Sequence, residues 1–155
     1  MNYETLLKEA DSQFLVVKEK PLIANDGRIK GKRIAIRQDV QTDAEKACIL
    51  AEELGHYHTT VGDILDQSDT SNRKQELHAR AWAYQRGLQL SDIVRAFKYG
   101  CRNRYEISEY LGVTEAFLQN GIDYYNGKYG SYTKCGNYII YFDPLGVLEF
   151  ESFNT

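Results

Sequence analysis

The sequence has few cysteines, and none of them form a closely spaced pair. Its three cysteines, Cys48, Cys101 and Cys135, are odd in number and widely separated along the chain. Because no C-x-x-C pair occurs, the sequence indicates neither a disulfide framework nor a thiolate zinc knuckle. A few widely spaced cysteines are typical of a protein from a reducing compartment. We therefore expect a cytoplasmic protein.

The sequence also lacks long apolar runs and an excess of positive charge. No run is long enough to cross a membrane, and the N-terminal residues do not have the pattern of a signal peptide, so we expect no membrane association. The formal net charge is −3, whereas general nucleic-acid binders are usually basic, so we expect no direct nucleic-acid binding. The charged fraction of 26% and the apolar fraction of 43% are ordinary for a globular domain with its own core.

The strongest helix signal is the stretch TDAEKACILAEELGHYHT, which begins at Thr42. Thr42 and Glu45 have the spacing of a capping box, which marks a helix start. Apolar residues recur at helical spacing and predict a buried face: Ala44, Ala47, Cys48, Leu50, Ala51 and Leu54. Glu52 and His56 stand four apart and share another face, with Glu53 at its edge. This is the geometry of the two-histidine zinc helix H-E-x-x-H, with Glu52 in place of the first histidine.

A second helix is predicted from Asn72 to Gln85, and all three histidines lie on or beside these two helices. Its apolar stripe is expected to consist of Leu77, Ala81 and Tyr84, with Glu76 beside it. Histidine is the commonest metal ligand, but a lone histidine is more often an incidental surface residue. His58 either joins the site or is a solvated residue near the helix C-terminus. His78 lies two residues from Glu76 and is expected to face elsewhere.

His56 differs from a lone histidine because two glutamates precede it on an otherwise apolar helix. Burying unpaired carboxylates is costly, so a metal ion is the favoured explanation for this group. Zinc accepts carboxylate oxygens as well as imidazole nitrogens. Two carboxylates would also shift the preference toward a harder metal such as manganese. The alternative is an ordinary solvated, charged helix face.

The rest of the chain predicts an α+β fold with a small antiparallel sheet packed on a helical bundle. Strands are expected at Phe14–Lys18 and Arg33–Arg37, and the second of these is an edge strand to which an extended peptide can add. Arg104–Tyr125 has the pattern of a helix-turn-helix. Its second helix lacks the basic residues that contact phosphates, so we interpret it as a packing scaffold. Tyr138–Phe142 and Val147–Phe150 predict a C-terminal β-hairpin.

The segment CILAEELGHYHT, with QELHARAWA further along the chain, resembles the ImmA/IrrE family of cytoplasmic metallo-endopeptidases of phages and mobile genetic elements. In that family the helix usually reads H-E-L-G-H, and a later E-x-x-A helix supplies a third ligand. By position, Glu53 matches the general base, His56 the second histidine ligand and Glu76 the acidic third ligand. Glu52 occupies the position of the first ligand, so this chain carries an E-E-x-x-H variant. His58 and His78 are auxiliary candidates.

The resemblance implies a zincin-like fold, a zinc or manganese cofactor and a protein partner, in particular a helix-turn-helix repressor. It also implies a single metallopeptidase-like domain over residues 1–155, with a catalytic-type core at 1–88, a helix-turn-helix-like part at 89–130 and a hairpin tail at 131–155. The implied function is that of a metal-dependent endopeptidase that relieves repression by cleaving the repressor. The alternative is a non-catalytic antirepressor that binds and sequesters the repressor.

Overall fold

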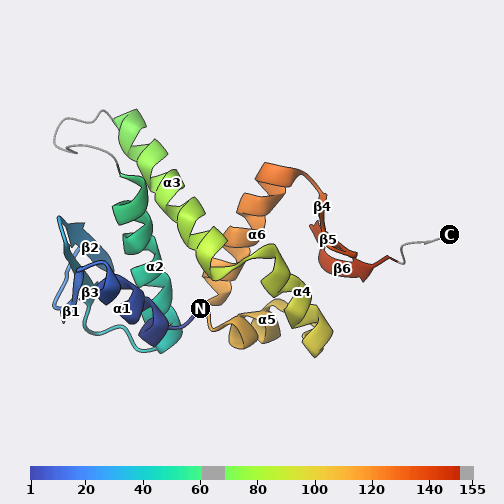
Figure 1. Ribbon diagram of the computed structural model, residues 1–155, viewed down its shortest axis with the longest axis horizontal. Coiled ribbons are helices and arrows are strands. Elements are labelled where there is room, and N and C mark those ends of the chain that lie inside the picture. Colours follow the sequence, from blue (N-terminus) through green and yellow to red (C-terminus); the bar gives the residue numbers. More distant parts are fainter. Residues whose placement is uncertain (61–68, 151–155) are drawn as a thin grey trace. The chain divides into compact units, whose positions relative to one another are not determined.

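The computed structural model describes residues 1–60 and 69–150, and the chain divides into two compact units, Met1–Gly87 and Leu88–Thr155 (Figure 1). The first unit contains α1 (Tyr3–Ser12), β1 (Val16–Lys20), β2 (Gly27–Lys30), β3 (Arg33–Arg37), α2 (Asp43–Thr59) and α3 (Asp69–Gly87). The second contains α4 (Leu90–Tyr99), α5 (Arg104–Leu111), α6 (Glu115–Tyr129), β4 (Tyr132–Cys135), β5 (Tyr138–Phe142) and β6 (Leu145–Glu149). The predicted α+β class is confirmed. No described helix is long and apolar enough to span a bilayer.

The sheet of the first unit is mixed, with strand order β1-β3-β2. The antiparallel pair is the β2–β3 hairpin, which turns at Gly31 with a φ of +60°. β1 runs parallel to β3. After β1 the chain forms β2 at the opposite edge of the sheet, and the β2–β3 hairpin then brings it back to the central position. The strand Arg33–Arg37 is therefore central, and its predicted edge position is wrong. β2 is an edge strand of this sheet.

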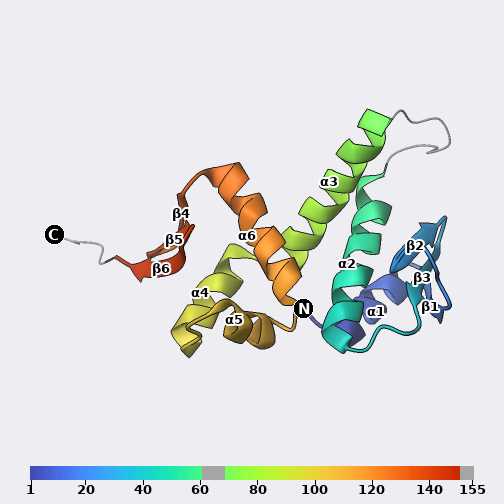
Figure 2. The same cartoon turned by 180° about the vertical axis from the view of Figure 1, so that it is seen from behind.

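Helix α2 is the core element of the first unit. It lies between the sheet and α3 in both views (Figures 1 and 2), and it contacts β2, β3 and α3. Its predicted start is confirmed, because the Thr42 hydroxyl oxygen accepts a hydrogen bond from the Glu45 backbone N–H at 3.1 Å. The core residues Ile34, Leu50 and Leu54 are almost fully buried. One face of α2 is thus packed in the core, and the adjacent face can hold polar side chains.

Helices α2 and α3 approach each other backbone to backbone. A Cβ atom added at Gly55 would lie 2.3 Å from the carbonyl oxygen of Ala79, so no side chain fits between the helices there. The buried residues of α3 include Ala79 and Ala83, whereas Leu77 is 64% exposed. The predicted apolar stripe is thus wrong at Leu77, because the close crossing selects small residues and not large ones.

The second unit contains the predicted pair of helices and the predicted hairpin. Between α5 and α6, Gly112 adopts a left-handed conformation, and the Thr114 hydroxyl oxygen caps α6 by accepting from the Phe117 N–H at 3.0 Å. Strands β5 and β6 pair antiparallel, which confirms the C-terminal hairpin. β4 adds a third strand, which was not predicted because its four residues are too few to show alternation. The single-domain organisation stays a prediction.

Candidate metal centre on helices α2 and α3

Two predicted ligands from different helices meet in the first unit. The imidazole Nε2 of His56 on α2 lies 3.1 Å from the carboxylate Oε2 of Glu76 on α3. The pairing follows from the close helix crossing, since Gly55 directly precedes His56 and Ala79 is one turn beyond Glu76. Their side chains are 23% and 42% exposed, so a ligand can reach the pair from solvent.

Glu53 is buried beside this pair, between α2 and β2. It is only 9% exposed, and a Cβ atom added at Gly27 of β2 would lie 2.8 Å from its Oε1. Burial, followed by repulsion from the charges of Glu52 and Glu76, raises the pKa of Glu53 to about 7. A carboxyl group with this pKa can accept a proton and release it again near neutral pH.

The charges of Glu76 and Arg80 act on Glu52, but Glu52 does not take part in the contact between His56 and Glu76. Burial raises its pKa, the charge of Arg80 opposes this rise, and the charges of Glu76 and Asp26 add to it. In residues 1–60 and 69–150, no three His, Cys, Asp or Glu side chains form a group arranged to hold a metal ion. The structure therefore brings His56 and Glu76 together, with Glu52 one helical turn away on the same face as His56.

The distance between His56 Nε2 and Glu76 Oε2, which form an ion pair, is also close to the distance between two ligand atoms on one metal ion. Two ligand atoms bound about 2.0–2.1 Å from a tetrahedral zinc ion lie about 3.3 Å apart. The separation of 3.1 Å between His56 Nε2 and Glu76 Oε2 is close to this value. Glu52 lies one turn before His56 on α2, so the two side chains are neighbours on the helix surface.

Arg80 is a member of this cluster that the sequence analysis missed. Its Nε lies 3.4 Å from Oε1 of Glu76, which is the carboxylate oxygen that does not face His56. The guanidinium group therefore already places a positive charge beside Glu76 and near Glu52. The signal in the sequence was the spacing of four between Glu76 and Arg80, which is the spacing of a helical ion pair.

The two auxiliary histidines lie outside the pair. The ring of His58 stacks on Trp82 of α3, with ring centroids 4.8 Å apart and an interplanar angle of 19°. This contact holds His58 against α3. His78 is exposed on α3, and a separation of two residues turns it away from Glu76.

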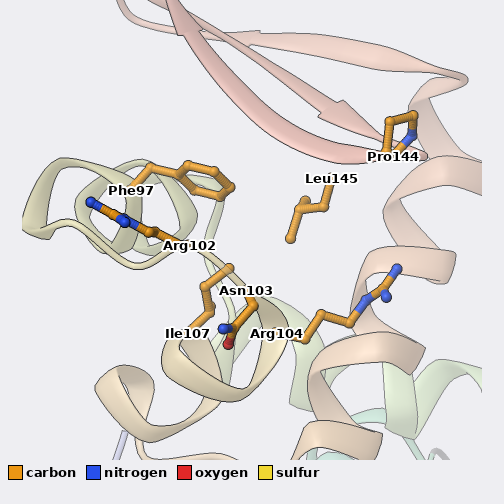
Figure 3. A pocket seen from close by; sticks show the side chains of 7 residues that line it. All are labelled: Phe97, Arg102, Asn103, Arg104, Ile107, Pro144 and Leu145. Atoms are coloured by element: carbon orange, nitrogen blue, oxygen red, sulfur yellow. The ribbon is translucent and has the colours of Figure 1, made fainter.

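A separate pocket of about 230 Å³ lies in the second unit, where Phe97 and Leu145 face the cavity and Arg104 extends along one side (Figure 3). The residues that line it are Phe97, Arg102, Asn103, Arg104, Ile107, Pro144 and Leu145. It contains no carboxylate, histidine or cysteine side chain, so the candidate metal centre remains the one on α2 and α3.

The structure thus places a buried carboxylate, Glu53, near a histidine–carboxylate pair on two packed helices. The family model described as the IrrE N-terminal-like domain, Peptidase_M78, matches residues 4–123, and the chain belongs to this family. The match covers α2, α3 and every candidate residue. Membership implies a metallopeptidase-type role with a metal cofactor and a protein substrate. No match was found among curated proteins or among solved structures.

Proposed function

We propose that this protein is a metal-dependent endopeptidase that relieves repression by cleaving a helix-turn-helix repressor of a phage or mobile element. The observation that carries the proposal is the contact of 3.1 Å between His56 and Glu76, with the buried Glu53 beside it. Family membership supports the metallopeptidase part of the proposal. The repressor as substrate rests on the resemblance to ImmA/IrrE proteins.

Each residue of the centre has a distinct role in this proposal. His56 and Glu76 would hold zinc or manganese, and Glu52 would be the third ligand. The bound metal would lower the pKa of water and polarise the peptide carbonyl. Glu53 takes a proton from the attacking water and delivers it to the departing amine, for which a pKa of about 7 is well suited.

The position of β2 supports an extended peptide as the substrate. β2 is an edge strand, and no other described strand pairs with its outer side, where another strand can add. Gly27 at the start of β2 is in contact with Glu53, and its missing side chain lets the carboxyl group lie against the strand. A peptide added along β2 would therefore pass close to the general base.

The test is incubation of the purified protein with candidate helix-turn-helix repressors from the same genome, followed by intact-mass spectrometry. With Zn²⁺ or Mn²⁺ we expect cleavage at an internal peptide bond, and with EDTA we expect none. Cleavage that continues at the same rate in EDTA would contradict a metal-dependent peptidase.

One set of observations favours the alternative, a non-catalytic antirepressor that sequesters the repressor. Glu52 replaces the usual first histidine, and Arg80 already forms an ion pair with Glu76. Under this alternative, light scattering after gel filtration would find a stoichiometric complex with uncleaved repressor in EDTA. The endopeptidase proposal instead expects fragments once the metal is supplied.

A further inference from the structure

The outer face of the first sheet carries a concentration of positive charge. Along β3, Ile34 and Ile36 are buried, so Arg33 and Ala35 point to the opposite face. Residues that pair across strands share a face. Lys18 of β1 and Arg28 of β2 pair with Ala35, and Lys30 pairs with Arg33, so their side chains belong to the outer face.

Five exposed cations gather on this face, which we call the basic face: Lys18, Lys20, Arg28, Lys30 and Arg33. Within the described part of the chain, no carboxylate forms an ion pair with any of them. By contrast, Arg37 at the end of β3 pairs with Asp26 and Asp39, and Lys46 of α2 pairs with Glu19. Like charges on neighbouring strands destabilise a sheet. Their concentration in a chain with a net charge of −3 therefore indicates an anionic partner.

The basic face also has an apolar floor. A groove of about 530 Å³ is lined by these five cations together with the apolar residues Val16, Leu22 and Ala35. Val16 is 50% exposed, although a valine in a strand usually packs against a neighbour. The groove thus offers apolar contacts between positively charged rims.

We propose that the basic face binds an acidic segment of a protein partner that carries apolar side chains between its carboxylates. The cations would pair with the carboxylates, and the apolar floor would take up the aliphatic side chains. A nucleic-acid backbone fits this face less well, because phosphates and sugars gain little from Val16 and Leu22. Among the described residues that line the groove, none has an aromatic side chain on which a base can stack. This binding is separate from the proposed peptidase activity, because none of the candidate metal ligands lies on this face.

The test is fluorescence polarisation with a labelled short peptide of mixed glutamate, aspartate, leucine and valine, in EDTA so that no cleavage occurs. A peptide with lysine in place of the acidic residues and a short DNA duplex are measured beside it. We expect the acidic peptide to bind the intact chain, more weakly as salt is added. The lysine peptide and the duplex should bind at least tenfold more weakly.

The double variant Lys18→Glu, Lys30→Glu should lower the affinity for the acidic peptide at least tenfold. The matched control is Lys74→Glu, Lys128→Glu, which makes the same change in net charge at exposed positions elsewhere and should bind as the wild type does. If the reversed charges disturb folding, Lys18→Gln, Lys30→Gln provides the same comparison. The proposal would be overturned if the acidic peptide did not bind, or if both Glu double variants lost the same affinity for it. It would also be overturned if the DNA duplex bound more tightly than the acidic peptide.

Discussion

Replacing Glu53 with glutamine is expected to lower the rate of repressor cleavage by about 10²- to 10⁴-fold, the usual contribution of a general base. Glutamine keeps the shape of the side chain against Gly27 but cannot accept a proton. Binding of the repressor should therefore be retained while kcat falls. Single-turnover cleavage and the Kd for the repressor, measured on the same preparations, separate the two effects. Equal cleavage by the variant and the wild type would contradict the role of Glu53.

The same variant should change the pH dependence of stability in the metal-free protein. The pKa of Glu53 is raised from 4.5 to about 7 in the folded state, so between these pH values the folded chain holds a proton that the unfolded chain has released. The contribution of protonated Glu53 to the free energy of unfolding is complete below pH 4.5 and is lost as the pH rises through 7. Above pH 7 the ionised, buried group lowers the free energy of unfolding by about 3 kcal/mol at most.

We therefore expect Glu53→Gln to be more stable than the wild type at pH 8 and to show a smaller fall in stability between pH 5 and pH 8. Urea unfolding in EDTA at both pH values measures this difference. Glu109→Gln, a change at an exposed carboxyl on α5, is the matched control and should keep the pH dependence of the wild type. Parallel pH profiles for Glu53→Gln and the wild type would show that Glu53 is not held in a costly environment.

Replacing Gly55 with alanine should destabilise the first unit by about 1–3 kcal/mol, the usual cost of overpacking. The added Cβ would lie 2.3 Å from the Ala79 carbonyl oxygen, which is backbone and cannot move aside without separating α2 from α3. The separation should also draw His56 away from Glu76 and weaken metal binding. Urea unfolding and a zinc titration of the variant measure the two consequences.

Gly127→Ala on α6 is the matched control for Gly55→Ala. A Cβ atom at Gly127 meets nothing within 4 Å, so the usual preference of a helix for alanine should leave stability unchanged or raise it by up to about 1 kcal/mol. Both variants replace glycine with alanine, but their effects on the free energy of unfolding are expected to have opposite signs. If Gly55→Ala is as stable as Gly127→Ala, the close helix crossing does not position the site.

Local signals in the sequence predicted much of the fold. The Thr42 cap, the turn at Gly112 and the β5–β6 hairpin each depend on neighbouring residues, and each is present in the structure. Strand order depends on contacts between distant residues, which explains the wrong edge position of Arg33–Arg37. The exposure of Leu77 has a similar cause, because the crossing at Gly55 and Ala79 decides which side of α3 is buried.

The candidate centre was predictable in composition but not in arrangement. The spacing of Glu52, Glu53 and His56 placed these residues along one part of α2, and the resemblance assigned Glu76 to them. Helix periodicity cannot tell which residues of two helices meet, so the contact between His56 and Glu76 and the position of Arg80 required the structure. The basic face likewise emerges only from the register of three strands.

We propose that α2 and α3 together hold one cation between His56 and Glu76. Calorimetric titration of metal-free protein with Zn²⁺ and Mn²⁺ tests it most directly, with the variants His56→Ala and Glu76→Gln and with His58→Ala as the control. We predict one ion for each wild-type chain, at least tenfold weaker binding in the first two variants, and unchanged binding in His58→Ala. Absence of binding to the wild type, or equal affinity in all four proteins, would contradict the metal centre.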